Sequence, residues 1–163
     1  MKKTASLTQT AAERRAAEAQ LTELIAKFAP AHSKLIGSVR RSLRKRLPTA
    51  CEVVYEYRDW FVISYSPSDR GYEGVLGIRA SADGVRLYFN RAKDLPDPEK
   101  LLRGSSGQSR WIELEKATAM KKPACVTLID EAVARNPVPF APAGRGPVLI
   151  RSTAAQKRSR SGK

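Results

Sequence analysis

The sequence predicts an α+β fold, a two-layer sandwich in which helices pack on one face of a mainly antiparallel sheet of about five strands. Three observations support this prediction. Apolar residues recur at helical spacing in the first fifty residues and again over residues 123–135. Between them, apolar and polar residues alternate with a period of two, which is typical of strands. Short polar turns separate these strands, as in antiparallel hairpins.

Two helices are predicted at the N-terminus. Thr10 and Glu13 form a capping box, so the first helix begins after Thr10, and Pro30 ends it. A second helix is predicted over residues 32–46. Its apolar residues fall on one side and its basic residues on the other, which makes it strongly amphipathic. The basic side carries Lys34, Arg40, Arg41, Arg44 and Lys45.

The sheet is predicted to begin with two hairpins. Residues 51–57 and 60–65 form the first, joined by Arg58-Asp59, and residues 74–80 and 85–89 form the second, joined through Ala82-Asp83-Gly84. A short helix is predicted over residues 98–103, because a proline starts it and Gly104 follows it. A fifth strand is predicted over residues 109–114. A final helix is predicted over residues 123–135, with Val126, Ile129 and Val133 facing inward.

The charge of the chain divides it into three regions. The net charge of the 163 residues is +14, with eleven Lys or Arg against three Glu in residues 1–50 and thirteen basic against thirteen acidic residues in 51–136. Residues 137–163 hold six basic and no acidic residues. We therefore expect an N-terminal extension with the start of the first helix (1–20), one α+β domain (21–136), and a Pro/Gly-rich and then basic flexible tail (137–163).

Several classes of protein are disfavoured by the sequence. No apolar stretch follows Met1-Lys2-Lys3, and no apolar run approaches the roughly 20 residues of a membrane helix, so a cytoplasmic protein without a transmembrane segment is expected. Cys51 and Cys125 lack metal-site or disulfide-framework spacing and are expected to be buried free thiols. No complete catalytic signature is present, which favours a non-enzymatic binding or adaptor protein.

The first candidate site is a basic one. Its residues lie on the second helix and in the tail: Arg40, Arg41, Arg44, Lys45, Lys157, Arg158 and Arg160. Such a set can bind an anionic macromolecule, nucleic acid in particular, by neutralising phosphates in a salt-sensitive way. The alternative is a solvated helix face whose charges favour the helix C-terminus. The sequence shows no helix-turn-helix, zinc finger or RNA-binding aromatic motif, so base-specific reading is not expected.

The second candidate is the loop that contains Gly104, Ser105, Gly107, Arg110 and Trp111. Glycines let backbone amides converge on an anion, and an arginine can clamp a carboxylate or a phosphate, so the loop is a candidate site for a small anionic ligand. The alternative is that the two glycines serve only a helix end and a turn. The loop lacks the Gly-Lys-Ser/Thr ending of a phosphate-binding P-loop.

The third candidate is a set of carboxylates, Glu52, Glu56 and Asp59, on or beside the first strand. Glu52 and Glu56 share one face of that strand and can hold a hard cation or perform acid–base chemistry. The alternative is that they form surface salt bridges with Arg79 and Arg86 across the sheet.

Residues from about 21 to 135 resemble the YdhG-like domain family, a bacterial family of mostly unknown function that is described as frataxin-like. The resemblance rests on the paired N-terminal helices, the closing helix and three ordered segments: Leu47-Pro48-x-Ala50-x-Glu52, Val85-Arg86-Leu87-Tyr88-Phe89, and the stretch from Leu101 through Gly104 and Gly107 to Arg110-Trp111-Ile112. It implies a frataxin-like α+β sandwich. It also implies iron binding or iron delivery as an alternative function, for which Glu52, Glu56 and Asp59 would be the ligands.

Overall fold

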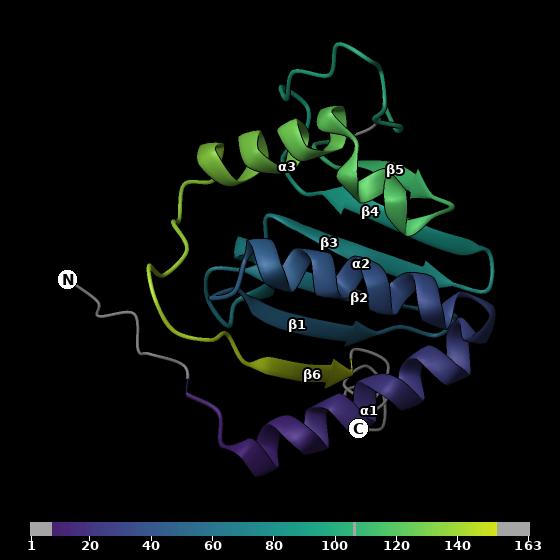
Figure 1. The fold of residues 1–163 in the computed structure, drawn as a ribbon, viewed down its shortest axis with the longest axis vertical. Coiled ribbons are helices and arrows are strands. Elements are labelled where there is room, and N and C mark those ends of the chain that lie inside the picture. Colours follow the sequence, from purple (N-terminus) through teal and green to yellow (C-terminus); the bar gives the residue numbers. More distant parts are fainter. Residues whose placement is uncertain (1–7, 106, 153–163) are drawn as a thin grey trace, which may run out of the picture.

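A computed structural model of the protein describes residues 8–105 and 107–152. It confirms the α+β fold: helices pack against a six-stranded open sheet with the strand order β5-β4-β3-β2-β1-β6 (Figure 1). The helices are α1 (Ala11–Phe28), α2 (Ser33–Arg46) and α3 (Pro123–Arg135). The strands are β1 (Cys51–Glu56), β2 (Trp60–Ser66), β3 (Leu76–Ser81), β4 (Gly84–Phe89), β5 (Arg110–Leu114) and β6 (Val148–Ser152). All neighbouring strands are antiparallel except β6, which runs parallel to β1.

The predicted helix start and hairpins agree with the structure. The Thr10 hydroxyl accepts a hydrogen bond of 3.0 Å from the backbone N–H of Glu13 and so caps α1. The β1–β2 hairpin is closed by a backbone hydrogen bond of 2.9 Å from Tyr57 N–H to the carbonyl of Trp60. The β3–β4 hairpin turns through Ala82 and Asp83 and pairs Ser81 with Gly84. These two hairpins form the centre of the sheet.

The prediction of a short helix over residues 98–103 is wrong. The Asp97 carboxylate instead accepts hydrogen bonds of 2.8 Å from the backbone N–H groups of Leu101 and Leu102, which holds this segment in a turn. Arg103 then exchanges two backbone hydrogen bonds with Trp111, of 2.7 and 3.1 Å, and lies extended beside β5. The local side-chain acceptor and the pairing with β5 replace the hydrogen bonds that a helix would form.

The sheet has a sixth strand beyond Asn136, in the region for which the sequence predicts a flexible tail. Val148 is buried in β6, and its backbone N–H and carbonyl both bind the side-chain amide of Gln9, at 3.0 and 2.7 Å. The chain approaches β1 so closely at Gly146 that a Cβ there would lie 1.7 Å from the carbonyl oxygen of Ala50. Gly146 is therefore required for the entry into β6. The predicted contact residues Lys157, Arg158 and Arg160 lie outside the described residues.

The two faces of the sheet differ in their environment. Strand residues of one face, which include Val54, Phe61 and Ile78, form the hydrophobic core together with apolar residues of α1, α2 and α3. The ring centroids of Phe28 and Phe61, for example, are 6.3 Å apart. The three helices thus cover one face of the sheet (Figure 1). Alternate strand residues point to the other face, which we call the open face because none of these helices covers it.

Candidate functional site

The basic residues predicted on α2 fall into two groups. The Arg40 side chain is only 13 % exposed and binds two carboxylates, Glu18 at 2.7 Å and Glu52 at 2.8 and 2.9 Å. Arg44 approaches the same two carboxylates at 3.3 and 3.5 Å. Arg41 and Lys45, in contrast, are exposed and form no ion pair with any described residue. Arg40 therefore joins α1, α2 and β1, which makes its main role structural.

The charged cluster around Arg40 is satisfied on all sides. Hydrogen bonds from Arg40 hold the pKa of Glu18 below its ordinary value. Glu52 also accepts a hydrogen bond of 2.8 Å from the hydroxyl of Tyr65, whose pKa is raised by burial and by the nearby carboxylate. Arg40, Glu18, Glu52 and Tyr65 are called the buried ion cluster below.

The three predicted metal ligands have different surroundings in the structure. Glu52 belongs to the buried ion cluster, Glu56 pairs with Lys27 at 3.2 Å, and Asp59 lies exposed in the β1–β2 turn. Within residues 8–105 and 107–152, no group of three or more His, Cys, Asp or Glu side chains is arranged to hold a metal ion.

The alternative interpretation, in which Glu52 and Glu56 form salt bridges with Arg79 and Arg86 across the sheet, is wrong. Both carboxylates point to the helix-covered face, whereas Arg79 and Arg86 alternate with the core residues of β3 and β4 and point to the open face. Arg86 pairs instead with Glu113 of β5, at 2.7 Å.

The predicted ligand loop borders the open face through Ser109 and Trp111. Arg110 donates hydrogen bonds of 2.9 and 2.8 Å to the carbonyls of Gly107 and Ser109 in its own loop. Gly104, with φ of 102°, packs so closely on Trp111 that a Cβ would lie 2.5 Å from the indole ring. Trp111 faces a hollow on the open face, whereas Ser105 is exposed.

The hollow on the open face has a volume of about 460 Å³ and is here called the open-face hollow. Aromatic side chains dominate its lining, which includes both tryptophans and four of the five tyrosines of the chain: Tyr55, Tyr57, Trp60, Tyr72, Tyr88 and Trp111. Tyr72 is 73 % exposed, while Tyr88 is so enclosed that burial raises its pKa. Aromatic rings with a polar edge are thus concentrated on the face that the helices leave open.

Two arginines lie side by side in the open-face hollow. Arg79 and Arg86 are direct cross-strand partners on β3 and β4. The Arg79 guanidinium lies 4.1 Å from the ring centre of Trp60, and that of Arg86 lies 4.8 Å from the ring centre of Trp111. Trp60 in turn stacks on Tyr57, with ring centroids 3.9 Å apart. The rings therefore hold both guanidiniums in place on the open face.

The charge of this arginine pair is only partly balanced. Glu113 neutralises Arg86, but Arg79 is exposed and has no carboxylate partner among the described residues. Like charges directly opposite each other destabilise a sheet. Two adjacent guanidiniums over aromatic rings, one of them without a carboxylate partner among the described residues, form a surface that can bind an anion.

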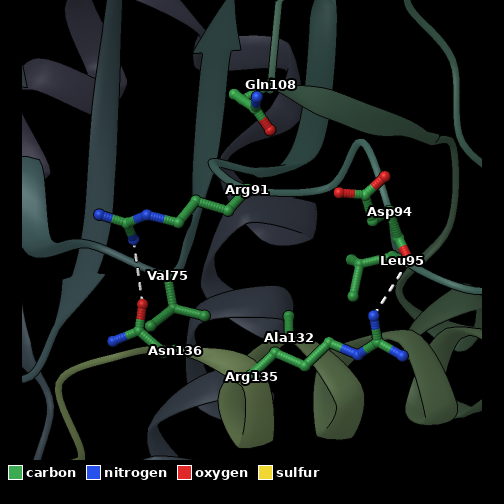
Figure 2. A pocket seen from close by; sticks show the side chains of 8 residues that line it. All are labelled: Val75, Arg91, Asp94, Leu95, Gln108, Ala132, Arg135 and Asn136. Carbon is green, nitrogen blue, oxygen red and sulfur yellow. Dashed lines mark hydrogen bonds between the residues drawn. The ribbon is translucent and has the colours of Figure 1, made fainter.

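A second cavity, of about 480 Å³, lies between α3 and the β4–β5 connection (Figure 2). Its apolar floor consists of Val75, Leu95 and Ala132. Figure 2 shows the guanidiniums of Arg91 and Arg135 at opposite sides, where Arg91 donates to Asn136 at 3.0 Å and Arg135 donates to the carbonyl of Asp94 at 3.1 Å. The two charges do not converge, so the open-face hollow is the better candidate site.

Both cysteines are buried free thiols, as predicted. Burial raises the pKa of Cys51 to about 11 and also raises the pKa of Cys125. At about pH 8 we therefore expect a thiol-specific reagent to leave the native protein unmodified and to label both cysteines after denaturation, as measured by mass spectrometry. The native rate at Cys51 should rise only as the pH approaches 11. Labelling of either thiol before unfolding would contradict this expectation.

No family model, curated protein or solved structure matches the chain. The resemblance to the YdhG-like family therefore stays a prediction. Among the helices of the described residues, none has the length and apolarity needed to cross a membrane.

Proposed function

We propose that the protein binds single-stranded nucleic acid in the open-face hollow. The observation that carries this proposal is the pair Arg79 and Arg86, two adjacent guanidiniums held on the rings of Trp60 and Trp111. Arginine on an aromatic surface supplies the two elements that a single strand needs, a cation for phosphate and a flat surface on which a base stacks. The proposal agrees with the net charge of +14.

The strand pairing extends the positive charge across the sheet. The register aligns Arg151 of β6 with Tyr55 of β1, which pairs with Val62 of β2, and the same row continues through Arg79 and Arg86. Three arginines therefore follow one line across the open face, with aromatic side chains on and beside it. A phosphate backbone that crosses the strands along this row would contact each of them.

The hollow favours a single strand over a duplex for a geometric reason. The aromatic rings and Arg79 border a concave surface, where an unpaired base can enter and stack. A duplex keeps its bases stacked inside and offers mainly phosphates to a surface that is built from strands. Duplex binding is therefore expected to depend on charge alone and to be weaker.

The test is a fluorescence anisotropy titration with labelled single-stranded DNA, single-stranded RNA and duplex DNA of about 16 nucleotides. We expect the single strands to bind more tightly than the duplex and to weaken linearly in a log–log plot between about 50 and about 200 mM salt. Tyr72→Ala should reduce single-strand affinity about tenfold, because it removes an exposed ring at the edge of the hollow.

The matched control is Lys45→Ala, which removes an exposed side chain from α2 on the other side of the sheet. It is expected to change affinity less than twofold. Equal binding of duplex and single strand, or an unchanged affinity of Tyr72→Ala, would contradict the proposal.

A further inference from the structure

A second group of arginines lies on the helix side of the protein, away from the open-face hollow. They line a shallow groove between the start of α1, the end of α2 and the segment before β6: Arg14, Arg15, Arg44 and Arg145, together with Ala11 and Glu18. We call this surface the helix-side groove. Arg14 and Arg145 are brought together because the chain returns to α1 as it enters β6.

Arg14 is held in the groove with one side of its guanidinium unsatisfied. Its Nη2 donates a hydrogen bond of 2.7 Å to the carbonyl of Gly146. Its Nη1 is buried and has no hydrogen-bond partner among the described residues. Burial and the neighbouring Arg145 and Arg44 lower the pKa of Arg14. A buried N–H donor without an acceptor is unfavourable, and an anion in the groove would remove that cost.

The positive charge of the groove exceeds what its own carboxylate can balance. Glu18 already binds Arg40 through both oxygens at 2.7 Å and reaches Arg44 at 3.3 Å. Arg15 and Arg145 are exposed and form no ion pair with any described residue. The groove also adjoins the first turn of α1, where the free backbone N–H groups give a partial positive charge.

We propose that the helix-side groove binds a phosphate group that carries two negative charges, with Arg14 and Arg145 as its main ligands. Guanidinium donors match the oxygen geometry of phosphate and bind it through paired, charge-assisted hydrogen bonds. The unsatisfied Nη1 of Arg14 is closed to solvent, so the Arg14 side chain would turn toward the groove to donate one such bond, and Arg145, on a segment that borders the groove, would bind the anion from the other side. This site is separate from the open-face hollow and does not depend on the function proposed for it.

The test measures thermal stability in increasing inorganic phosphate, with sodium chloride at equal ionic strength as the control. Phosphate should raise the melting temperature with a saturable concentration dependence that chloride does not reproduce. Arg145→Ala, in an exposed segment, should weaken the phosphate effect about tenfold, since it removes a charged hydrogen-bond donor. Arg14→Gln should weaken the phosphate effect in the same way. If Arg14→Gln does not fold, the result for Arg145→Ala alone decides the test.

Two variants serve as controls. Arg41→Ala removes an exposed arginine of α2 that does not line the groove, and Arg79→Ala disables the open-face hollow. Both are expected to retain the full phosphate effect, so a failure of this proposal is distinguishable from a failure of the proposed nucleic-acid binding. A shift that chloride reproduces, or an unchanged phosphate affinity of Arg145→Ala, would overturn the site.

A second arm identifies the source of the phosphate group. A 5′-phosphorylated oligonucleotide is compared with the same oligonucleotide that carries a 5′-hydroxyl. A preference for the phosphorylated end that disappears in Arg145→Ala would support the site and assign it to a nucleic-acid terminus. Equal binding of the two oligonucleotides, together with a saturable effect of inorganic phosphate, would support a small phosphorylated molecule as the ligand.

Discussion

Replacing Glu52 by Gln is expected to lower the free energy of unfolding by about 3–5 kcal/mol, the usual cost of removing one partner from a buried ion pair. The Glu52 side chain is 3 % exposed and accepts hydrogen bonds from Arg40 and from Tyr65. A glutamine at this position keeps the shape but loses the negative charge, and its amide N–H₂ would face other donors. Arg40 would be left with only Glu18 as a partner in a mostly buried site.

Glu56→Gln provides the matched control, because Glu56 lies on the same strand and the same face four residues later. Its partner Lys27 has a side chain that is 63 % exposed, and ion pairs of this kind contribute less than about 1 kcal/mol. Urea denaturation followed by circular dichroism compares the two variants with the unmodified protein. If Glu52→Gln is no less stable than Glu56→Gln, the buried ion cluster does not hold α1, α2 and β1 together.

This cluster also shows why the amphipathic pattern of α2 misplaced Arg40. The pattern separates an apolar side from a basic side, and both Arg40 and Arg41 fall on the basic side. It contains no information on what lies beside the helix. In the structure, Glu18 of α1 and Glu52 of β1 flank Arg40, while Arg41 is exposed and donates a hydrogen bond to Ser38 of its own helix. Contacts between elements decide the role of each arginine, and local periodicity does not encode them.

The helices and hairpins depend on local signals, so the sequence could predict most of them. The β3–β4 turn also fixes the pairing of Arg79 with Arg86, since Ser81 pairs with Gly84 and the register follows from there. That pair could have been found from the sequence. That Glu52 and Glu56 lie on the opposite, helix-covered face could not, because their partners Arg40 and Lys27 come from α2 and α1. The parallel strand β6 was missed for a similar reason: its partner β1 lies about a hundred residues earlier, behind a Pro/Gly-rich segment.

The second large effect is expected from Arg79→Glu, which should abolish most single-strand binding and leave the fold intact. The new carboxylate would lie directly opposite Arg86, so a like-charge pair becomes an opposite-charge pair, which favours the sheet by about 0.2–1 kcal/mol. Loss of the guanidinium on Trp60 costs a similar amount. The free energy of unfolding should therefore stay within about 1 kcal/mol of that of the unmodified protein.

Affinity for a single-stranded oligonucleotide should fall at least about a hundredfold in the same variant, because a phosphate would meet a carboxylate in place of a cation. Arg41→Glu is the matched control: it makes the same change in net charge at an exposed position of α2. If overall charge governs binding, the two variants lose affinity equally. If the open-face hollow is the site, Arg79→Glu loses far more, and its unchanged stability shows that Arg79 serves binding and not folding. A larger loss in Arg41→Glu would instead place the interface on α2 and overturn the proposed function.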